Sequence, residues 1–415
     1  MPVFRPFKAV RPVPEKAKEI ASLPYDVMDS QEAREEVKRN PLSYIHVEKA
    51  EVDLPEGTNL YSDEVYNKAK ENLYNYLKNG QMIQDEKPAF YVYRQVMDGR
   101  VQTGLVGCAA TEDYMNDVIK KHELTRAAKE ADRIKHVDTL NAHASPVFFT
   151  YRHRQDINAV VNKIVETKPE YDFISDDGIS HTLWVMNDPQ DIEIITSAFA
   201  DMDYLYVADG HHRTASAAKV GLLRKEANPN HTGQEEYNFF MTVIFPDNDL
   251  YIMDYNRVVK DLNGHSQEDF FNLVKEKFNL ELYKGQGPYH PEARHDFGMY
   301  IDGKWYKLTA KAGTFDENSP TKSLDVSILQ ENLLHPILAI GDPRTDERID
   351  FIGGIRGLEE LEKRVDSGRE VVAFAMYATS IQELIDIADA GEIMPPKSTW
   401  FEPKLRSGLF IHLLD

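Results

Sequence analysis

Residues 204–223 read YLYVADGHHRTASAAKVGLL, and this stretch decides the fold class. The aromatic and β-branched run at 204–208 predicts a strand, Asp209-Gly210 predicts a tight turn, and the small residues after Arg213 predict a helix. A second apolar run, FFMTVIF at 239–245, predicts the following strand. A turn that leaves a strand and opens a helix presents backbone N–H groups at the positive end of the helix dipole. The sequence therefore predicts an anion site here, of the kind that binds phosphate.

The polar residues of this turn suit phosphate chemistry. Gly210 allows the backbone to approach a phosphate closely, Arg213 offers a bidentate charged contact, and Asp209 could hold Mg²⁺ or orient a hydroxyl. The remaining candidates for phosphate binding are His211, His212 and Thr214. The alternative is an ordinary Asp-Gly turn with capping or surface histidines. A zinc site is disfavoured, because the two histidines are adjacent and no HExxH motif or cluster of cysteines accompanies them.

Two further segments carry candidate catalytic or substrate-binding groups. In KHELT, at 121–125, Glu123 stands near the start of the predicted helix 125–137, where the helix dipole would stabilise a carboxylate that serves as a base. The alternative is an exposed first-turn glutamate in ordinary charge pairs. Farther along the chain, Pro396 precedes Lys397, Ser398 and Thr399, which offer one positive charge and two hydroxyls to a phosphate or a small polar substrate. The alternative for this loop is a solvated surface.

Antiparallel hairpins shape the expected fold. The strands predicted at 89–96 and 101–110 are joined across Asp98-Gly99, and those at 298–301 and 304–310 are joined across Asp302-Gly303. Helices are predicted at 62–77 and, after the capping box of Ser380 and Glu383, at 381–390. These elements predict an α+β fold with mixed sheets rather than a doubly wound parallel sheet. We expect two lobes. The first, residues 1–250, contains Glu123 and the turn at 209–213, here called the phosphate turn; the second, residues 251–415, ends in a loop that returns to the site.

The composition narrows the function classes. The 415 residues include 48 Lys and Arg against 69 Asp and Glu, a formal charge of −21, which argues against a nucleic-acid partner. The single cysteine, Cys108, excludes an internal disulfide and fits a reducing compartment. No apolar run approaches the roughly 20 residues of a membrane-spanning helix, and the proline-broken N-terminal segment has no secretory apolar core. We expect a cytoplasmic protein without a membrane partner, whose oligomeric state the sequence leaves open.

Six blocks of sequence carry a resemblance to a known family. They are PYDV at 24–27, IKKHELT at 119–125, DR at 132–133, ADGHHRTASA at 208–217, NRVV at 256–259 and PPKSTWFEPKLRSGL at 395–409. With them the chain resembles, nearly end to end, a large bacterial family of domains of unknown function. The histidine-rich turn, the upstream glutamate segment and the C-terminal loop are also similar to those of free-serine kinases. Those enzymes phosphorylate free L-serine with ADP or ATP on a fold related to ParB and sulfiredoxin.

The resemblance implies a site and a reaction. Glu123 matches the catalytic carboxylate that engages the serine hydroxyl, and His122 lies beside it on the substrate side. The turn from Asp209 to Arg213 matches the one that binds nucleotide phosphates and a metal ion. The loop that closes over the substrate is matched by Lys397, Ser398 and Thr399. We therefore expect a kinase that uses ATP or ADP with Mg²⁺, on a ParB/sulfiredoxin-like core followed by a C-terminal α/β lobe.

Two departures from the serine kinases leave the acceptor open. About a hundred residues precede the glutamate segment without a counterpart, and the segment between Glu123 and Asp209 is longer than in the short serine kinases. Phosphotransfer is therefore better supported than serine as the acceptor. The competing hypothesis is a ParB-like nucleotide-binding module that regulates association with a partner and needs no carboxylate opposite the phosphate turn. Sulfiredoxin chemistry is excluded, because that turn needs a cysteine where this chain has His211.

Overall fold

The computed structural model describes residues 1–415 and shows an α+β protein whose chain divides into two compact units. Unit 1 comprises residues 1–121, 125–250 and 403–415, and unit 2 comprises residues 122–124 and 251–402. Two short segments therefore differ from the lobes expected from the sequence. Residues 403–415 belong to unit 1, where β21 (His412–Leu413) pairs with β7 (Ala142–His143). Residues 122–124 belong to unit 2, where the carbonyl of His122 accepts the backbone N–H of Met394.

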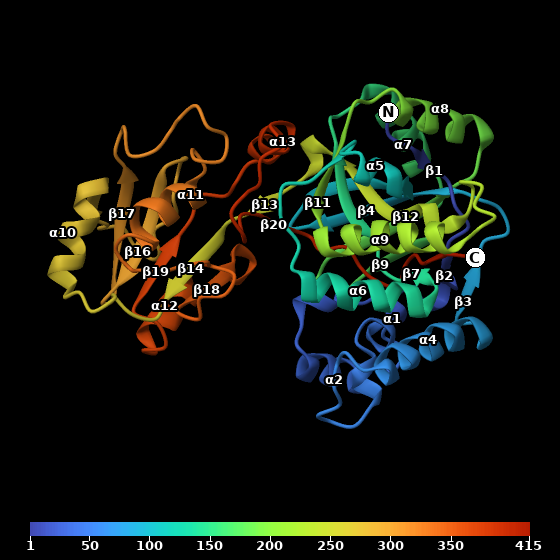
Figure 1. Ribbon diagram of the computed structural model, residues 1–415, viewed down its shortest axis with the longest axis horizontal. Coiled ribbons are helices and arrows are strands. Elements are labelled where there is room, and N and C mark those ends of the chain that lie inside the picture. Colours follow the sequence, from blue (N-terminus) through green and yellow to red (C-terminus); the bar gives the residue numbers. More distant parts are fainter. The chain divides into compact units, whose positions relative to one another are not determined.

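Unit 1 is built on a nine-stranded mixed sheet (Figure 1). The strand order is β6 (Ile119–Lys120), β11 (Leu205–Asp209), β8 (Val147–Tyr151), β12 (Phe239–Pro246), β5 (Arg100–Ala110), β4 (Phe90–Met97), β10 (Ser180–Met186) and β9 (Tyr171–Ile174), with β1 (Phe4–Arg5) paired to β5. The pairs β11–β6 and β12–β8 are parallel, whereas the other pairs are antiparallel. Outside this sheet, β2 (Val10–Pro12) pairs with β3 (Met82–Gln84). The mixed sheet confirms the fold class expected from the sequence.

Nine α-helices accompany the sheets of unit 1. They are α1 (Ala17–Ile20), α2 (Ser30–Arg39), α3 (Ile45–Glu48), α4 (Asp63–Lys78), α5 (Thr111–Met115), α6 (Ala127–Leu140), α7 (Gln155–Val165), α8 (Pro189–Ala200) and α9 (His211–Ala227). In Figure 1, α6 and α9 lie side by side, and the two helices are in extensive contact. Alanines 215, 217 and 218 of α9 are buried, since small side chains allow a helix to approach its neighbours closely.

Unit 2 is built on a separate six-stranded sheet in which all pairs are antiparallel. Its order is β15 (Phe278–Leu282), β17 (Lys304–Ala310), β16 (Asp296–Ile301), β19 (Val372–Ala375), β14 (Tyr255–Val259) and β18 (Ile349–Gly353). A two-stranded pair joins β13 (Ile252–Met253) to β20 (Trp400–Phe401). The helices are α10 (Gln267–Lys277), α11 (Asp325–Leu329), α12 (Glu359–Asp366) and α13 (Ile381–Asp389). We expected an α/β lobe here, and the unit combines helices with an antiparallel sheet.

The two Asp-Gly hairpins and the helix cap predicted from local sequence patterns are present in the structure. Asp98 and Gly99 have φ angles of 51° and 78° and join β4 to β5, while Asp302 and Gly303 have φ angles of 51° and 70° and join β16 to β17. Two successive positive φ angles match the right-handed twist of the flanking strands. The side chains of Ser380 and Glu383 form the predicted capping box of α13.

The predicted start of the helix after KHELT is wrong. Helix α6 begins at Ala127, with Arg126 at its N-cap, so Glu123 lies in the irregular segment before the helix. The acidic residue in the first turn of α6 is Glu130. Because the field of a helix dipole acts mainly within the first turn, it does not account for a carboxylate at position 123.

Candidate functional site

The strand–turn–helix predicted at 204–223 is present as β11, Gly210 and α9. Gly210 is the N-cap of α9 and has a φ of +86°, a left-handed conformation that favours glycine. Three positions after it, Arg213 is fixed by a hydrogen bond of 2.7 Å from Nη1 to the carbonyl of Pro146. Its Nη2 atom lies 4.0 Å from a carboxylate oxygen of Asp26, in the PYDV block. The turn therefore holds a guanidinium group at the N-terminal end of a 17-residue helix.

Asp209, the last residue of β11, is ionised and paired. Its Oδ2 accepts a hydrogen bond of 2.8 Å from Nζ of Lys404, and its Oδ1 accepts one of 2.8 Å from the N–H of Gly210. Burial by itself would raise the pKa of Asp209, but the positive charges of Lys404 and Arg213 lower it well below the usual range. Lys404 comes from the segment 403–415, so the C-terminal part of the chain adds a cation to the turn after β11.

The two histidines of the turn are neutral at pH 7. Burial lowers the pKa of His211 to about 4, against the opposing effect of Asp209, and burial also lowers the pKa of His212. Nε2 of His212 accepts the backbone N–H of Arg126 at 3.0 Å. Thr214 is buried, and its hydroxyl donates to the carbonyl of Gly210 at 3.1 Å. His212 thus ties the start of α6 to the turn, while the Thr214 hydroxyl stabilises the first turn of α9.

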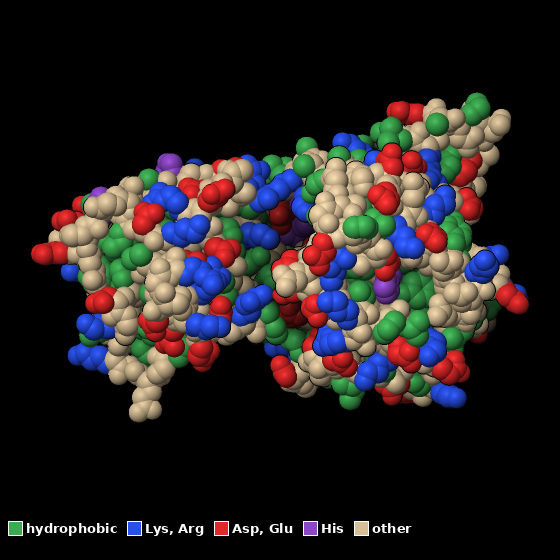
Figure 2. Space-filling model, turned by 90° about the horizontal axis from the view of Figure 1, so that it is seen from below, with side chains coloured by type: hydrophobic (Ala, Val, Ile, Leu, Met, Phe, Trp, Pro, Cys, Tyr) green, Lys and Arg blue, Asp and Glu red, His purple; other side chains and the backbone are tan.

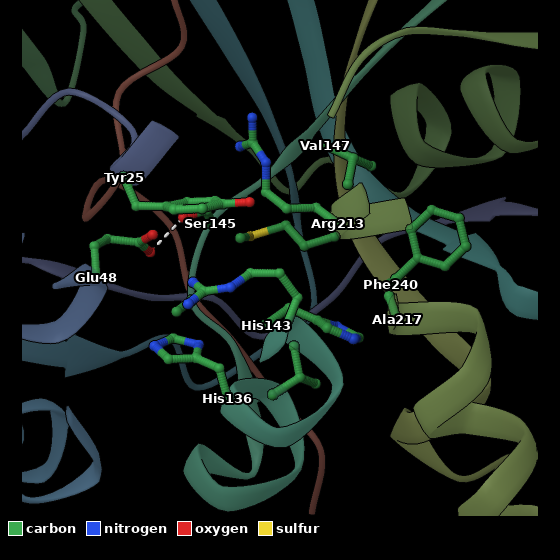
Figure 3. A pocket seen from close by; sticks show the side chains of 13 residues that line it. Tyr25, Glu48, His136, His143, Ser145, Val147, Arg213, Ala217 and Phe240 are labelled. Atoms are coloured by element: carbon green, nitrogen blue, oxygen red, sulfur yellow. Dashed lines mark hydrogen bonds between the residues drawn. The ribbon is translucent and has the colours of Figure 1, made fainter. Parts of the chain in front are cut away.

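A small cavity lies beside Arg213 and brings together three of the sequence blocks (Figure 3). The space open to the centre of a water molecule is about 30 Å³, and the polar lining residues are Tyr25, Glu48, Arg133, His136, His143, Ser145 and Arg213. Nε of Arg133 donates to Asp132 at 2.9 Å, and its guanidinium carbon lies 4.2 Å from the ring centre of Tyr25. PYDV, DR and the histidine-rich turn, which are far apart in the sequence, therefore share one lining.

A buried carboxyl closes one side of this cavity. The hydroxyl of Ser145 donates to Glu48, as the dashed line in Figure 3 marks. Burial raises the pKa of Glu48, although Ser145, Arg133 and Arg213 act in the opposite direction. Nε2 of His143 is buried at the same cavity without a hydrogen-bond partner. The cavity thus combines two guanidinium groups with a carboxyl, a hydroxyl and imidazoles.

The other predicted site residues belong to unit 2. The His122–Glu123 segment is joined there to the loop before Pro396, because the amide of Met394 donates to the carbonyl of His122 at 2.8 Å. Ser398 is buried, and its hydroxyl donates to the carbonyl of Pro395 at 2.6 Å. Lys397 is exposed and has a φ of +61°. Glu123 and His122 are thus in the same unit as Lys397, Ser398 and Thr399, whereas the approach of Glu123 to Asp209 stays a prediction.

Sequence reasoning missed three polar residues of unit 1. Lys404 lies inside the block PPKSTWFEPKLRSGL, so that block was a signal for it. Glu48 and Ser145 are 97 residues apart and stand in no chemical motif, so nothing local in the sequence pointed to their contact. Arg133 was visible as part of a block but not as a neighbour of Arg213.

A metal ion would need ligands from outside the chain. No group of three or more His, Cys, Asp or Glu side chains is close enough to hold one. Asp209 supplies one ionised carboxylate at the phosphate turn, and Mg²⁺ in nucleotide sites is commonly held by one or two carboxylates together with phosphate oxygens and water. The residues present fit Mg²⁺ only in that form, with Asp209 as the protein ligand.

The surface and the helices add two observations. On the face shown in Figure 2, Lys and Arg side chains are interspersed with Asp and Glu, in a chain whose formal charge is −21. No helix has both the length and the apolar character needed to cross a bilayer.

The sequence between residues 4 and 327 matches the family described as "Protein of unknown function (DUF1015)". The chain belongs to this family. The matched region includes the glutamate segment, the phosphate turn and Arg257, and it ends before the loop at 395–399. Among curated proteins, none matches the chain.

Several solved structures match the chain at low sequence identity and low TM-score. One is "Free serine kinase in complex with AMP", at 15% identity and a TM-score of 0.36, covering 71% of this chain and 89% of that chain. A conserved hypothetical protein from Pyrococcus furiosus has 14% identity and a TM-score of 0.35, with 72% and 93% covered. SbnI from Staphylococcus aureus, with a C-terminal truncation, has 10% identity and a TM-score of 0.32, with 74% and 87% covered.

Proposed function

We propose that the protein is a small-molecule kinase that transfers a phosphoryl group from ATP or ADP to the hydroxyl of free L-serine or a similar small metabolite. The observation that carries the proposal is the arrangement at the junction of β11 and α9. There Arg213 and Lys404 flank the ionised Asp209 at a helix N-terminus, and Arg133 lines the adjoining cavity. Fixed positive charge at a helix N-terminus is the arrangement that binds polyphosphate.

The chain's own groups would act chiefly by position and charge. Phosphoryl transfer asks little covalent work of a protein, because the transition state is stabilised by alignment and by neutralising the phosphoryl oxygens. Arg213 and the backbone N–H groups of the first turn of α9 would hold the nucleotide phosphates. Asp209 would provide the carboxylate ligand of Mg²⁺, which supplies charge neutralisation between the phosphates when bound.

Glu123 would act on the acceptor. Its carboxylate would take the proton of the acceptor hydroxyl as the new oxygen–phosphorus bond forms and the bond to the nucleotide breaks, so that the nucleotide leaves as ADP or AMP. His122, Lys397, Ser398 and Thr399 would hold the acceptor. The chain itself favours this role, since the amide of Arg126 is bonded to His212 of the phosphate turn. Glu123 lies three positions before Arg126, so an extended chain sets their Cα atoms at most about 11 Å apart.

The test is Glu123→Gln in the full-length protein. The protein is incubated with ATP or ADP, Mg²⁺ and a pool of free amino acids, and new phosphomonoesters are detected by ³¹P NMR. We expect turnover to fall by roughly 10²–10⁴-fold, while nucleotide affinity measured by calorimetry stays the same. Glu112→Gln, at an exposed position of α5, removes the same charge and serves as the control. Equal turnover in the two variants would remove Glu123 from this role.

The same assay separates the kinase from the binding module. Nucleotide binding without any new phosphomonoester, together with a nucleotide-dependent association with a partner, would support the ParB-like alternative. A kinase that draws on free nucleotides and a free metabolite would work in the cytoplasm, where both are found, and we propose that location.

A further inference from the structure

Arg257, in the middle of β14, is a buried cation without an ion-pair partner. Its exposed fraction is 3%. Its guanidinium donates to two backbone carbonyls, those of Tyr255 and Lys397, the second at 3.0 Å, and its carbon lies 5.4 Å from the ring centre of Phe351. Burial lowers the pKa of Arg257 to about 10, and only Tyr255 acts in the opposite direction. No carboxylate balances this charge.

Each of the other buried arginines of the protein is paired with a carboxylate. Arg11 and Arg133 lie 2.9 Å from the carboxylates of Asp85 and Asp132, and Arg406 pairs with Asp177. With 69 acidic residues in the chain, acids are not scarce, yet none lies against Arg257. Taking an ion out of water costs several kcal/mol, and neutral carbonyl dipoles repay this less well than a carboxylate does. A bound anion would supply the missing negative charge.

The charge of Arg257 is directed at the loop 395–399. Through the carbonyl of Lys397, Arg257 holds a residue whose φ is +61°, a conformation that costs a non-glycine residue energy. The ammonium group of Lys397 lies 5.5 Å from the ring centre of Tyr255, so a second cation stands in the same region. Thr399 follows two residues later and is partly exposed. The loop thus carries one cation and the hydroxyl of Thr399, and its backbone is held by a second cation, Arg257 of β14. The hydroxyl of Ser398 is bonded within the loop to Pro395.

We propose that Arg257 anchors an oxyanion-binding subsite in unit 2, in which Lys397 and Thr399 contact a carboxylate or phosphoryl group of a small-molecule ligand. Arg257 is a positioning residue: its guanidinium holds the backbone carbonyl of Lys397 and supplies positive charge from strand β14. That this ligand is the acceptor or its phosphorylated product rests on the proposed kinase function. A cation would be repelled by the two positive charges, and a neutral ligand would leave Arg257 unbalanced. An anion satisfies both conditions, because a charge in a low-dielectric surrounding acts strongly over several ångströms.

The subsite can be tested by binding alone, without nucleotide or turnover. Calorimetry on the full-length protein would use three probes: L-serine, serinol, which lacks the carboxylate, and inorganic phosphate. We expect Arg257→Met to weaken binding of the carboxylate- or phosphate-bearing probe, L-serine or inorganic phosphate, at least tenfold. Arg257→Lys should restore part of this binding. Arg356→Met removes a charge from an exposed turn of the same unit and should leave binding unchanged. Loss of the preference for L-serine over serinol would identify a carboxylate, and loss of phosphate binding would identify a phosphoryl group.

A second pair of variants guards against misfolding of Arg257→Met. Lys397 is exposed and Thr399 partly so, hence Lys397→Met and Thr399→Val should fold and still weaken the same probe. The inference is overturned if the wild-type protein binds none of the probes, or if all these variants bind them as tightly as Arg356→Met does. If the probes bind as expected but no phosphomonoester is ever formed, the subsite stands and the kinase proposal fails.

Discussion

The cations near the candidate site in unit 1 and Arg257 in unit 2 have different kinds of partner. In unit 1, Arg133 lies against Asp132, Arg213 lies near Asp26, and Lys404 lies against Asp209. In unit 2, Arg257 has no carboxylate beside it. A buried carboxyl of the same unit, that of Asp325, accepts the N–H of His295 at one oxygen and has no partner at the other. The named cations of unit 1 are thus paired with carboxylates of the folded chain, whereas Arg257 and Asp325 of unit 2 have no such partner.

The difference indicates different ways of preparing for a ligand. The cations of unit 1 are held in place by carboxylates, so a phosphate would meet groups that are already oriented, which lowers the cost of reorganisation. The cation of unit 2 is held only by carbonyls, so a ligand would add the missing charge. Stability should therefore depend on ion pairs in unit 1 and on ligand or pH in unit 2.

The largest effect is expected from breaking an ion pair of unit 1. Arg133→Met would leave Asp132, which is 9% exposed, with only the hydroxyl of Tyr66 at 2.7 Å. Removing one partner of a buried pair costs about 3–5 kcal/mol, so the urea midpoint should fall steeply. Arg257→Met should cost clearly less, because it removes a charge that no carboxylate stabilises.

Unfolding followed by circular dichroism compares the two variants, and Arg133→Lys, which keeps the charge, should recover part of the loss. If Arg257→Met lowers the free energy of unfolding as much as Arg133→Met does, the two guanidinium groups are equally stabilised. That outcome would remove the contrast between the units.

A second effect concerns the pH dependence of unit 2. Burial raises the pKa of Asp325 to about 7, against the hydrogen bond from His295. The folded state therefore binds the proton of Asp325 more tightly than the unfolded chain does. The stability that this proton contributes is fully present below about pH 4 and is lost as the pH rises to about 7. Asp325→Asn is neutral throughout and should gain about 2–3 kcal/mol over the wild type between pH 5 and pH 8.5.

Urea unfolding at several pH values measures this difference, and Asp316→Asn, at an exposed position, is the matched control. A difference between wild type and Asp325→Asn that stays constant with pH would mean that Asp325 is ionised in the folded protein like an ordinary surface acid.

The smallest effect is expected at Lys404. Lys404 lowers the pKa of Asp209, so in Lys404→Met this pKa should rise, and the acid limb of nucleotide binding should move to higher pH. At pH 7 the loss of one fixed positive charge should weaken nucleotide binding about tenfold, the size of one charge-assisted hydrogen bond. Calorimetric titration with ADP from pH 4.5 to 8 measures both quantities.

Lys225→Met, at an exposed position of α9, removes the same charge and should change neither quantity. An unchanged acid limb in Lys404→Met would show that the ion pair with Asp209 has no influence on the phosphate turn.

Much of the fold was predictable where a local pattern has one backbone solution. The two Asp-Gly hairpins, the capping box at Ser380 and the strand–turn–helix at 205–227 all formed as predicted. The start of α6 was not, because its N-cap, Arg126, makes no side-chain capping bond and gives no sequence signal. The ion pair between Lys404 and Asp209 also escaped prediction, because its two residues are 195 positions apart and share no local pattern.

The sequence by itself determined the turn between β11 and α9, because Asp209 and Gly210 are adjacent and the left-handed conformation of Gly210 is a local property of glycine. It also determined the antiparallel hairpins, since turn chemistry depends on two adjacent residues. Only the tertiary structure decided which charges are balanced. It brought Lys404 to Asp209 and Glu48 to Ser145 and left Arg257 with carbonyls alone. Burial and long-range contacts set the energy of a charge, and neither can be read from the order of residues along the chain.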